Sequence, residues 1–156
     1  MEPQPNSITQ VRSADFGDFE AMLELAHRGH AASENARYKF DAQAAIILAG
    51  QCILEDSLCA FVATSDKEVV GLLLGQEQKY PYLKMRYATD LVLYAEHPGA
   101  GRSLVERFKR WAFDERKVDQ VLMGVSYGGH KANVVSRMYE RMGFREVGGM
   151  HVLNRE

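Results

Sequence analysis

The chain has 156 residues, of which 46% are hydrophobic and 26% charged, with a formal net charge of −2 at pH 7. These numbers predict one domain with a real core at residues 7–156, behind a disordered tail at residues 1–6 that contains Pro3 and Pro5. The balanced charge excludes a sequence-independent nucleic-acid binder, which needs a basic stripe, and no apolar run approaches the ~18 residues of a membrane span.

The first predicted elements are a strand and two helices. Alternating side chains from Ile8 to Arg12 predict a short strand. Ser13 is the expected N-cap of a helix that ends near Gly29, since apolar residues between them fall at helical spacing. A second helix is expected from Asp41 to about Gln51.

Three strands are predicted next. Residues 58–64 and 68–78 are apolar runs joined by Ser65-Asp66-Lys67, which is typical turn sequence, so the two runs predict a hairpin. Lys79 to Tyr82 ends the second run, and residues 86–94 alternate again as a further strand.

The last part of the chain predicts helices alternating with strands. A helix that starts near residue 99 carries an apolar stripe at Leu104, Val105, Phe108, Trp111 and Ala112. A strand at Val121–Val125, a helix at Lys131–Met142 and a closing strand at Phe144–Leu153, interrupted by Gly148-Gly149, complete the order β-α-α-β-β-β-α-β-α-β. This order predicts an α/β fold in which a mixed sheet has helices on both faces.

Cysteine and histidine placement gives little sign of metal or disulfide chemistry. Cys52 and Cys59 lie in apolar runs, which favours reduced, buried thiols and a cytoplasmic location. The five histidines lack metal-ligand spacing, so we expect no metal site.

The segment from Glu96 to Ser103 is the first candidate site. It reads Glu-His-Pro-Gly-Ala-Gly-Arg-Ser, follows a predicted strand and opens the amphipathic helix. A glycine turn at a helix start offers unpaired N–H groups and a positive dipole end, which together suit a pyrophosphate. An ordinary strand-to-helix turn is the alternative.

The second candidate segment runs from Asn133 through Tyr139 to Gly143-Phe144. Gly143 suits the left-handed position that ends a helix, and Phe144 would then pack back against it. Asn133 is either an N-cap or a ligand-binding residue. Tyr139 is either a half-buried core tyrosine or a functional one.

Together the two segments resemble the acetyl-CoA site of the GNAT (general N-acetyltransferase) superfamily. The order of elements from Ile8 to Leu153 agrees with that family, and residues 90–94 resemble small GNAT proteins encoded by tailed bacteriophages. The resemblance implies a mostly antiparallel sheet whose fourth and fifth strands splay apart around acetyl-CoA.

The family's phosphate-loop pattern, Gln/Arg-x-x-Gly-x-Gly/Ala, fits this chain in two registers. One register uses Glu96, Gly99 and Gly101, and the other uses Pro98, Gly101 and Ser103. Both depart from the family at the first position. Arg102 either supplies the missing positive charge or is an exposed arginine at a helix start.

The resemblance also implies roles for individual residues. The backbone near Leu93 would polarise the thioester carbonyl, and the Tyr139 hydroxyl would protonate the departing thiolate. The residues implied to bind acetyl-CoA are Leu91, Val92, Leu93, Gly99, Ala100, Gly101, Arg102, Ser103, Asn133 and Tyr139.

An attacking amine must first lose a proton, and a carboxylate is expected to take it. Asp90 is the first candidate and Glu77 the second, while the alternative for each is a solvated charge at a strand edge. The predicted function is acetyl-CoA-dependent N-acetyl transfer to an amine-bearing acceptor, without nucleic acid or membrane, in a monomer or a homodimer.

Two other functions are kept as alternatives. One is a catalytically silent GNAT-fold protein that binds a partner protein, and the other is an unrelated phosphate-ligand binder. Acceptor specificity is expected in residues 30–40, in the turn after Gln78 and near Gly148.

Overall fold

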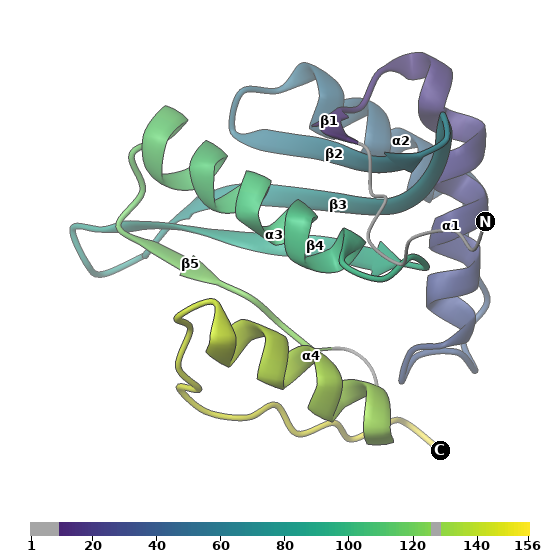
Figure 1. Ribbon diagram of the computed structural model, residues 1–156. Helices are drawn as coiled ribbons and strands as arrows, with labels where there is room; N and C mark the ends of the chain where they lie inside the picture. The colour runs from purple at the N-terminus through teal and green to yellow at the C-terminus, as the bar shows by residue number, and fades with distance from the viewer. Residues whose placement is uncertain (1–9, 126–128) are drawn as a thin grey trace.

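A five-stranded sheet forms the centre of the molecule (Figure 1). The computed structural model describes residues 10–125 and 129–156, so the expected tail at residues 1–6 lies outside it. Strands β1 to β4 pair antiparallel in sequence order, and β5 joins β4 in parallel. The bounds are β1 Gln10–Ser13, β2 Leu58–Ser65, β3 Glu68–Lys79, β4 Arg86–Ala95 and β5 Gln120–Leu122.

Helices cover both faces of this sheet, as the element order predicts. Helices α1 (Phe19–Ala31) and α2 (Ala42–Leu54) cover one face, and α3 (Ala100–Arg110) covers the other, where it continues as the π-helical turn η2 (Trp111–Glu115). Helix α4 (Gly129–Arg141) follows β5 and lies beside α3. The predicted mixed, mostly antiparallel α/β fold is confirmed.

The apolar stripe of α3 forms the densest part of the core. Leu104, Val105 and Phe108 are each 0% exposed, because the 3.6-residue period turns all three toward the sheet. Gly75 of β3 permits this close approach: a Cβ at residue 75 would lie 2.4 Å from the Phe108 ring and 3.0 Å from the Cys59 sulfur.

Strand β4 pairs with β3 along its whole length but with β5 only near its start. Its pairing with β5 covers only Tyr87 to Thr89, opposite Gln120 to Leu122. Just beyond, a bulge leaves Leu91 as an extra residue, since Leu74 pairs with Val92 and Gly75 pairs with Asp90. Strands β4 and β5 therefore separate after Thr89, as the resemblance implies, and open a gap beside Asp90.

The structure corrects the expected start of the first helix. Asp15, rather than Ser13, caps a short 3-10 helix, η1 (Phe16–Asp18), from which α1 continues. The Asp15 carboxylate accepts the Gly17 N–H at 2.9 Å, and the Asp18 carboxylate accepts the Asp15 N–H at the same distance. This capping box supplies two acceptors where a serine hydroxyl would supply one.

The end of the chain also differs from expectation. Strand β5 is shorter than the expected Val121–Val125, and the predicted closing strand at Phe144–Leu153 is wrong, since residues 144–156 are irregular. Gly148, with a φ of +148°, interrupts this stretch in a conformation that favours glycine. The segment instead runs back toward the loop that follows α1, where the Tyr38 hydroxyl donates to Asn154 Oδ1 at 2.7 Å.

The expected end of α4 and the expected free thiols are confirmed. Gly143 has a φ of +95°, and it ends α4 while the Phe144 N–H donates to the Tyr139 carbonyl at 3.0 Å. Cys52 and Cys59 are both buried and free. No helix within residues 10–125 or 129–156 is long and apolar enough to cross a bilayer.

Candidate functional site

The start of α3 presents unpaired backbone donors. Gly99 adopts a φ of +82°, which a glycine tolerates and which turns the chain directly into the helix. The Ala100 N–H donates to His97 O and the Ser103 N–H to Gly99 O. Across the described part of the chain, the N–H groups of Gly101 and Arg102 between them meet no acceptor.

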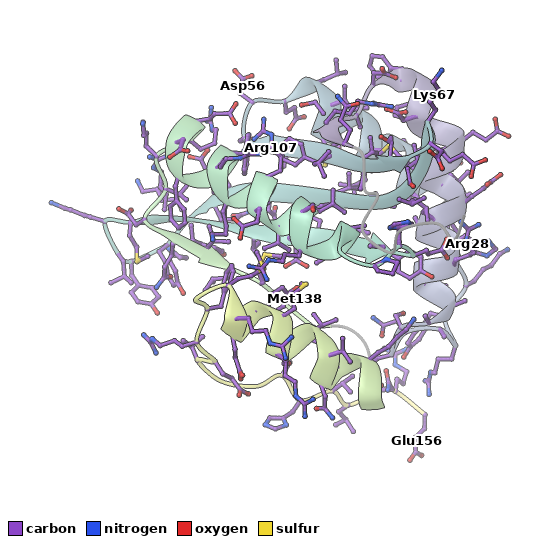
Figure 2. The ribbon with its side chains drawn as sticks, in the orientation of Figure 1. Arg28, Asp56, Lys67, Arg107, Met138 and Glu156 are labelled. Atoms are coloured by element: carbon purple, nitrogen blue, oxygen red, sulfur yellow. The ribbon has the colours of Figure 1, made fainter. Side chains whose placement is uncertain are left out.

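The surroundings of Gly101 leave room for a ligand at this helix start. A Cβ at residue 101 would be 3.9 Å from the Met138 sulfur and 4.0 Å from the Ala95 Cβ, both ordinary contacts. Figure 2 shows Met138 on the side of α4 that faces α3. The helix start therefore lies between β4 and α4, at one end of the opening beside β4.

Glu96, just before this loop, is held by a residue far away in the sequence. Arg28 of α1 donates two hydrogen bonds to its carboxylate, both at 2.8 Å, and the Tyr94 hydroxyl donates a third at 2.8 Å. The hydrogen bonds from Arg28, above all, hold the pKa of Glu96 below its usual value. Glu96, which in one register stands where the family pattern has Gln or Arg, is thus paired with the cation Arg28.

A hydrogen-bonded chain spans the gap between β4 and α4. The Tyr139 hydroxyl donates to the Gly124 carbonyl oxygen at 3.1 Å, and the Gly124 N–H donates to Asp90 Oδ1 at 3.0 Å. Gly124 follows β5, so the departure of β5 from β4 brings both backbone groups of one residue into the gap. Tyr139 and Asp90, 49 residues apart, thereby bind the backbone of the same residue, Gly124.

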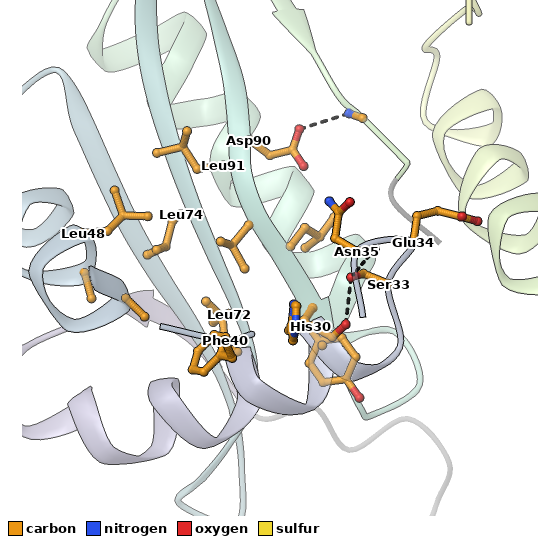
Figure 3. Close-up of a pocket in the computed structure, with 18 of the residues that line it drawn as sticks. His30, Ser33, Glu34, Asn35, Phe40, Leu48, Leu72, Leu74, Asp90 and Leu91 are labelled. Atoms are coloured by element: carbon orange, nitrogen blue, oxygen red, sulfur yellow. Dashed lines mark hydrogen bonds between the residues drawn. The ribbon is translucent and has the colours of Figure 1, made fainter. Parts of the chain in front are cut away.

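Asp90 is the carboxylate whose environment suits proton acceptance. Burial raises its pKa above the usual value, while the hydrogen bond from the Gly124 N–H opposes that rise. Its side chain points into the gap toward Gly124 (Figure 3). A carboxylate with a raised pKa is a stronger base than an exposed one, which is what removal of an amine proton requires.

A cavity of about 800 Å³ opens beside Asp90, on the face of the sheet covered by α1 and α2. Its walls come from these two helices, from β3 and β4, and from residues 150–154 near the end of the chain. Figure 3 shows Leu48, Leu72 and Leu74 on one side of it and Asp90 and Leu91 on another. Its volume is typical of a small-molecule site.

Comparison with known proteins identifies the fold. No family model matches the chain, and no curated protein matches it. Among solved structures, a transcriptional regulator from Bacillus halodurans C-125 is 20% identical, with a TM-score of 0.68, over 92% of this chain and 99% of that one. An aminoglycoside N-acetyltransferase in complex with CoA is 12% identical, with a TM-score of 0.73, over 94% of this chain and 93% of that one. A ribosomal-protein-alanine N-acetyltransferase from Brucella melitensis biovar Abortus 2308 is 14% identical, with a TM-score of 0.68, over 94% and 99%. The chain has the GNAT acetyltransferase fold.

On this GNAT fold, the residues expected to bind acetyl-CoA lie on three parts of the chain: the second half of β4, the start of α3 and helix α4. Leu91 is the extra residue of the β4 bulge, and Val92 and Leu93 follow it as half-buried residues. Asn133 is exposed inside α4, so it is not the N-cap of that helix, which begins at Gly129. Arg102 is likewise exposed, at the start of α3.

Glu77 lies apart from the GNAT opening. Its carboxylate pairs with Arg86 and with Arg116, the latter at 2.7 Å from Arg116 Nε. Burial alone would raise the pKa of Glu77, but hydrogen bonds from Arg116 and Arg86 outweigh burial and lower it. Glu77 neither lines the cavity beside Asp90 nor has an unpaired carboxylate oxygen.

Sequence reasoning missed two parts of this candidate site. Arg28 lies 68 residues before its partner Glu96, and only its place in the last turn of α1, near the strand end, could have suggested the contact. The cavity walls on α1 and α2 were also missed. The apolar residues Ile46 and Leu48 of α2, which line the cavity without being fully buried, were the available signal, because exposed apolar side chains indicate a binding surface.

Proposed function

We propose that the chain is an acetyl-CoA-dependent N-acetyltransferase that moves an acetyl group directly to an amine acceptor. The observation that carries this proposal is the opening between β4 and β5, which has unpaired helix N–H groups at one end and Asp90 and Tyr139 at the other. One structural neighbour supports it: an aminoglycoside N-acetyltransferase whose structures include one with CoA and one with a bisubstrate analogue of CoA.

The start of α3 would bind the pyrophosphate of acetyl-CoA. The N–H groups of Gly101 and Arg102 point out of the helix start, where the helix dipole favours negative charge. The remaining residues proposed for the cosubstrate are the β4 segment Leu91–Leu93, Gly99, Ala100, Ser103, Asn133 and Tyr139. The expected cytoplasmic location goes with this proposal, since acetyl-CoA is an intracellular cosubstrate.

Asp90 would take the amine proton, directly or through a water. The neutral amine then attacks the thioester carbonyl, so that the C–N bond forms and the C–S bond breaks. The backbone near Leu93 would polarise the carbonyl oxygen as charge develops on it. Tyr139 would leave the Gly124 carbonyl and give its proton to the departing thiolate. The nitrogen, which carries a second proton after the attack, would lose that proton to solvent as the amide forms, and solvent would return a proton to Tyr139. The products are an N-acetyl amide, free CoA and one proton.

Thermal unfolding with acetyl-CoA tests the binding step. Ligand at about 100 times its dissociation constant should add ~2.7 kcal/mol to the free energy of unfolding. Gly101→Glu should abolish this shift, because it places bulk and negative charge where the phosphates bind, while its Cβ fits without a clash. Gly149→Glu is the control, since no atom lies within 4 Å of that position. A melting temperature unchanged by millimolar acetyl-CoA or CoA would overturn the proposal.

Tyr139→Phe tests the chemical step. The variant keeps the ring that packs against Phe144, with centroids 5.5 Å apart, and removes only the hydroxyl. We expect kcat to fall about 10²- to 10⁴-fold with little change in acetyl-CoA affinity, measured by thiol release with an amine or with water as acceptor. A loss of stability without this fall in kcat would mean that the hydroxyl only holds Gly124.

The same assay weighs the alternative of a silent GNAT-fold protein that binds a partner protein. The departure from the family pattern at Glu96 favours that alternative. Binding of acetyl-CoA without acceptor acetylation or hydrolysis above background would support it. Hydrolysis that is lost in Tyr139→Phe would support catalysis.

A further inference from the structure

The cavity beside Asp90 has walls made mostly of apolar side chains. Helices α1 and α2 and strand β3 contribute a continuous apolar lining, and Leu72 and Leu74 at its floor are buried. Covering apolar walls of this kind with a ligand is favourable only when the ligand surface that covers them is also apolar. The principal apolar wall residues are Met22, Phe40, Ile46, Leu48, Leu72 and Leu74.

The charged groups that line the same cavity are acidic. Asp90 lies at the β4 wall, and Glu34 lies in the loop after α1 (Figure 3). Among the lining residues that the structure describes there is no lysine and no arginine. Arg37, in the nearby loop, does not line the cavity, and its guanidinium donates to the Arg155 carbonyl at 3.3 Å.

Two histidines, His30 and His151, also line the cavity. His30 Nε2 contacts the Tyr38 carbonyl oxygen at 2.6 Å, so this nitrogen acts as a donor to the loop. The His30 ring lies 5.6 Å from that of Phe40 and continues the apolar wall. His151 lies on the irregular segment near the end of the chain, at the cavity margin.

We infer that the acceptor is a primary amine carried on an apolar body, such as an aromatic ring or an alkyl chain, without a carboxylate or phosphate. The inference rests on the proposed function. The ammonium group approaches Asp90 and gives up its proton there. The apolar body of the same molecule packs against α1, α2 and β3. Glu34 adds negative potential at the cavity and attracts the protonated amine before it enters.

The same walls reject two other classes of amine. A free amino acid would place its carboxylate near two acidic groups and apolar carbon, where the carboxylate loses hydration and gains no cation. An aminoglycoside would bury many hydroxyl groups against walls that are mostly apolar, where neutral polar partners are limited to residues such as Ser33, Asn35, Thr89 and Asn154. This preference differs from that of the aminoglycoside N-acetyltransferases that share the fold.

Matched acceptors test the inference with the full-length chain. The probes are 2-phenylethylamine, phenylalanine, which adds only a carboxylate, and kanamycin, which carries several amino groups on polar rings. Thiol release from acetyl-CoA gives kcat/KM for each probe. We expect kcat/KM for 2-phenylethylamine to exceed that for phenylalanine and kanamycin by at least about tenfold. Equal or better turnover of either polar probe would overturn the inference.

A pair of neighbouring isoleucines gives a matched variant test. Ile46 lines the cavity and is 40% exposed, whereas Ile47 is 56% exposed and lies outside it. Ile46→Arg should lower kcat/KM for 2-phenylethylamine and raise it for phenylalanine, because it adds a cation to the wall. Ile47→Arg should change neither value, and both variants should fold, since both side chains already contact solvent.

Direct binding separates failure of this inference from failure of the proposed function. NMR titration of the chain alone with 2-phenylethylamine and with phenylalanine reports on the cavity without acetyl-CoA. Binding of the amine, weakened by Ile46→Arg, supports the inference even if acetyl-CoA does not bind. If acetyl-CoA binds but 2-phenylethylamine neither binds nor reacts, the inference is wrong and the proposed function stands.

Discussion

The two faces of the sheet are packed to very different densities. On the α3 face, Leu104, Val105 and Phe108 have no exposed surface, and a missing Cβ at Gly75 is needed to bring the Phe108 ring close. On the α1 and α2 face, a cavity of about 800 Å³ remains above the floor formed by Leu72 and Leu74. The dense face fixes β4 and the start of α3, and the open face leaves room for a second molecule.

Strand β4 contributes side chains to both of these faces. Side chains of β4 alternate between the faces, so Val92 packs with the α1 and α2 cluster and Leu93 with the α3 cluster. The bulge at Leu91 interrupts the alternation next to Asp90. The α3 face can therefore hold β4 in place while the other face keeps a cavity open.

The largest expected effect comes from emptying the dense face. Phe108→Ala should lower the free energy of unfolding by about 3–5 kcal/mol, since the surrounding atoms cannot collapse into the space left. Leu48→Ala, on a wall of the open cavity, should cost only about 1 kcal/mol, because it enlarges a space that already exists. Urea unfolding measures both, and equal costs would contradict the division between the faces.

The next effect concerns the carboxylate at the border of the open face. Asp90→Asn should lower kcat/KM by about 10²-fold or more, because asparagine keeps an oxygen for the Gly124 N–H but cannot take a proton. In the wild type, kcat/KM should rise with pH above the usual Asp range, since burial raises the pKa of Asp90. Asp114→Asn, at an exposed position of η2, is the control and should change neither value.

Asp90→Asn should raise the free energy of unfolding at neutral pH, although it lowers kcat/KM. A raised pKa in the folded chain means that Asp90 stabilises the fold at low pH and that this contribution is lost as pH rises through the raised pKa. Asp90→Asn should therefore be more stable than wild type at neutral pH, and the gain should vanish at acidic pH. An equal or lower stability at neutral pH would show that the charged form is compensated in the fold.

Local pattern is enough to predict the dense face. The stripe on α3, the hairpin of β2 and β3, the alternation in β4 and the glycine that ends α4 all follow from spacing and turn sequence, and the structure contains each of them. The closing strand could not be excluded from its sequence, because residues 144–153 have strand-like composition. Their actual course depends on contacts with a distant loop, such as the Tyr38 to Asn154 hydrogen bond.

The open face depends on contacts between segments that lie far apart in the sequence. Asp90 and Tyr139 were foreseen singly, but their junction at Gly124 requires the parallel pairing of β5 with β4 to end after three residues. The isolation of Glu77 likewise depends on Arg116, 39 residues later. The spacing of residues in the sequence predicts neither of these contacts.

A smaller effect should follow from breaking the ion pairs of Glu77. Glu77→Gln should cost about 1 kcal/mol in unfolding free energy, because solvent around Arg86 and Arg116 screens the pairs. Since the pKa of Glu77 is lowered, its contribution is present above the usual Glu pKa and is lost as pH falls through the lowered value. Glu68→Gln, at the exposed start of β3, is the matched control for unfolding at pH 7 and pH 3.

The same variant also checks the catalytic assignment. Glu77→Gln should leave kcat for acetyl-CoA hydrolysis unchanged, because the carboxylate lies outside the cavity and both of its oxygens accept arginine hydrogen bonds. A fall in kcat as large as that expected for Asp90→Asn would reassign the base to Glu77.

The smallest expected effect concerns the phosphate loop. Glu96→Gln should barely change stability, because its partner Arg28 is about half exposed and their ion pair is screened. Glutamine at this position restores the residue that the GNAT loop pattern has when it is placed on Glu96, Gly99 and Gly101. The left-handed Gly99 favours that register, since the pattern requires glycine there.

Acetyl-CoA affinity of the Glu96→Gln variant should rise by about two- to fivefold, because removal of one negative charge near the phosphates also lessens repulsion. Calorimetric titration at low and high salt measures the gain, which should shrink with salt. Glu106→Gln is the control, because Glu106 also pairs with a cation, Lys109, at 3.5 Å, but lies further along α3. An affinity that changes no more than in the control would place the motif on Pro98, Gly101 and Ser103 instead.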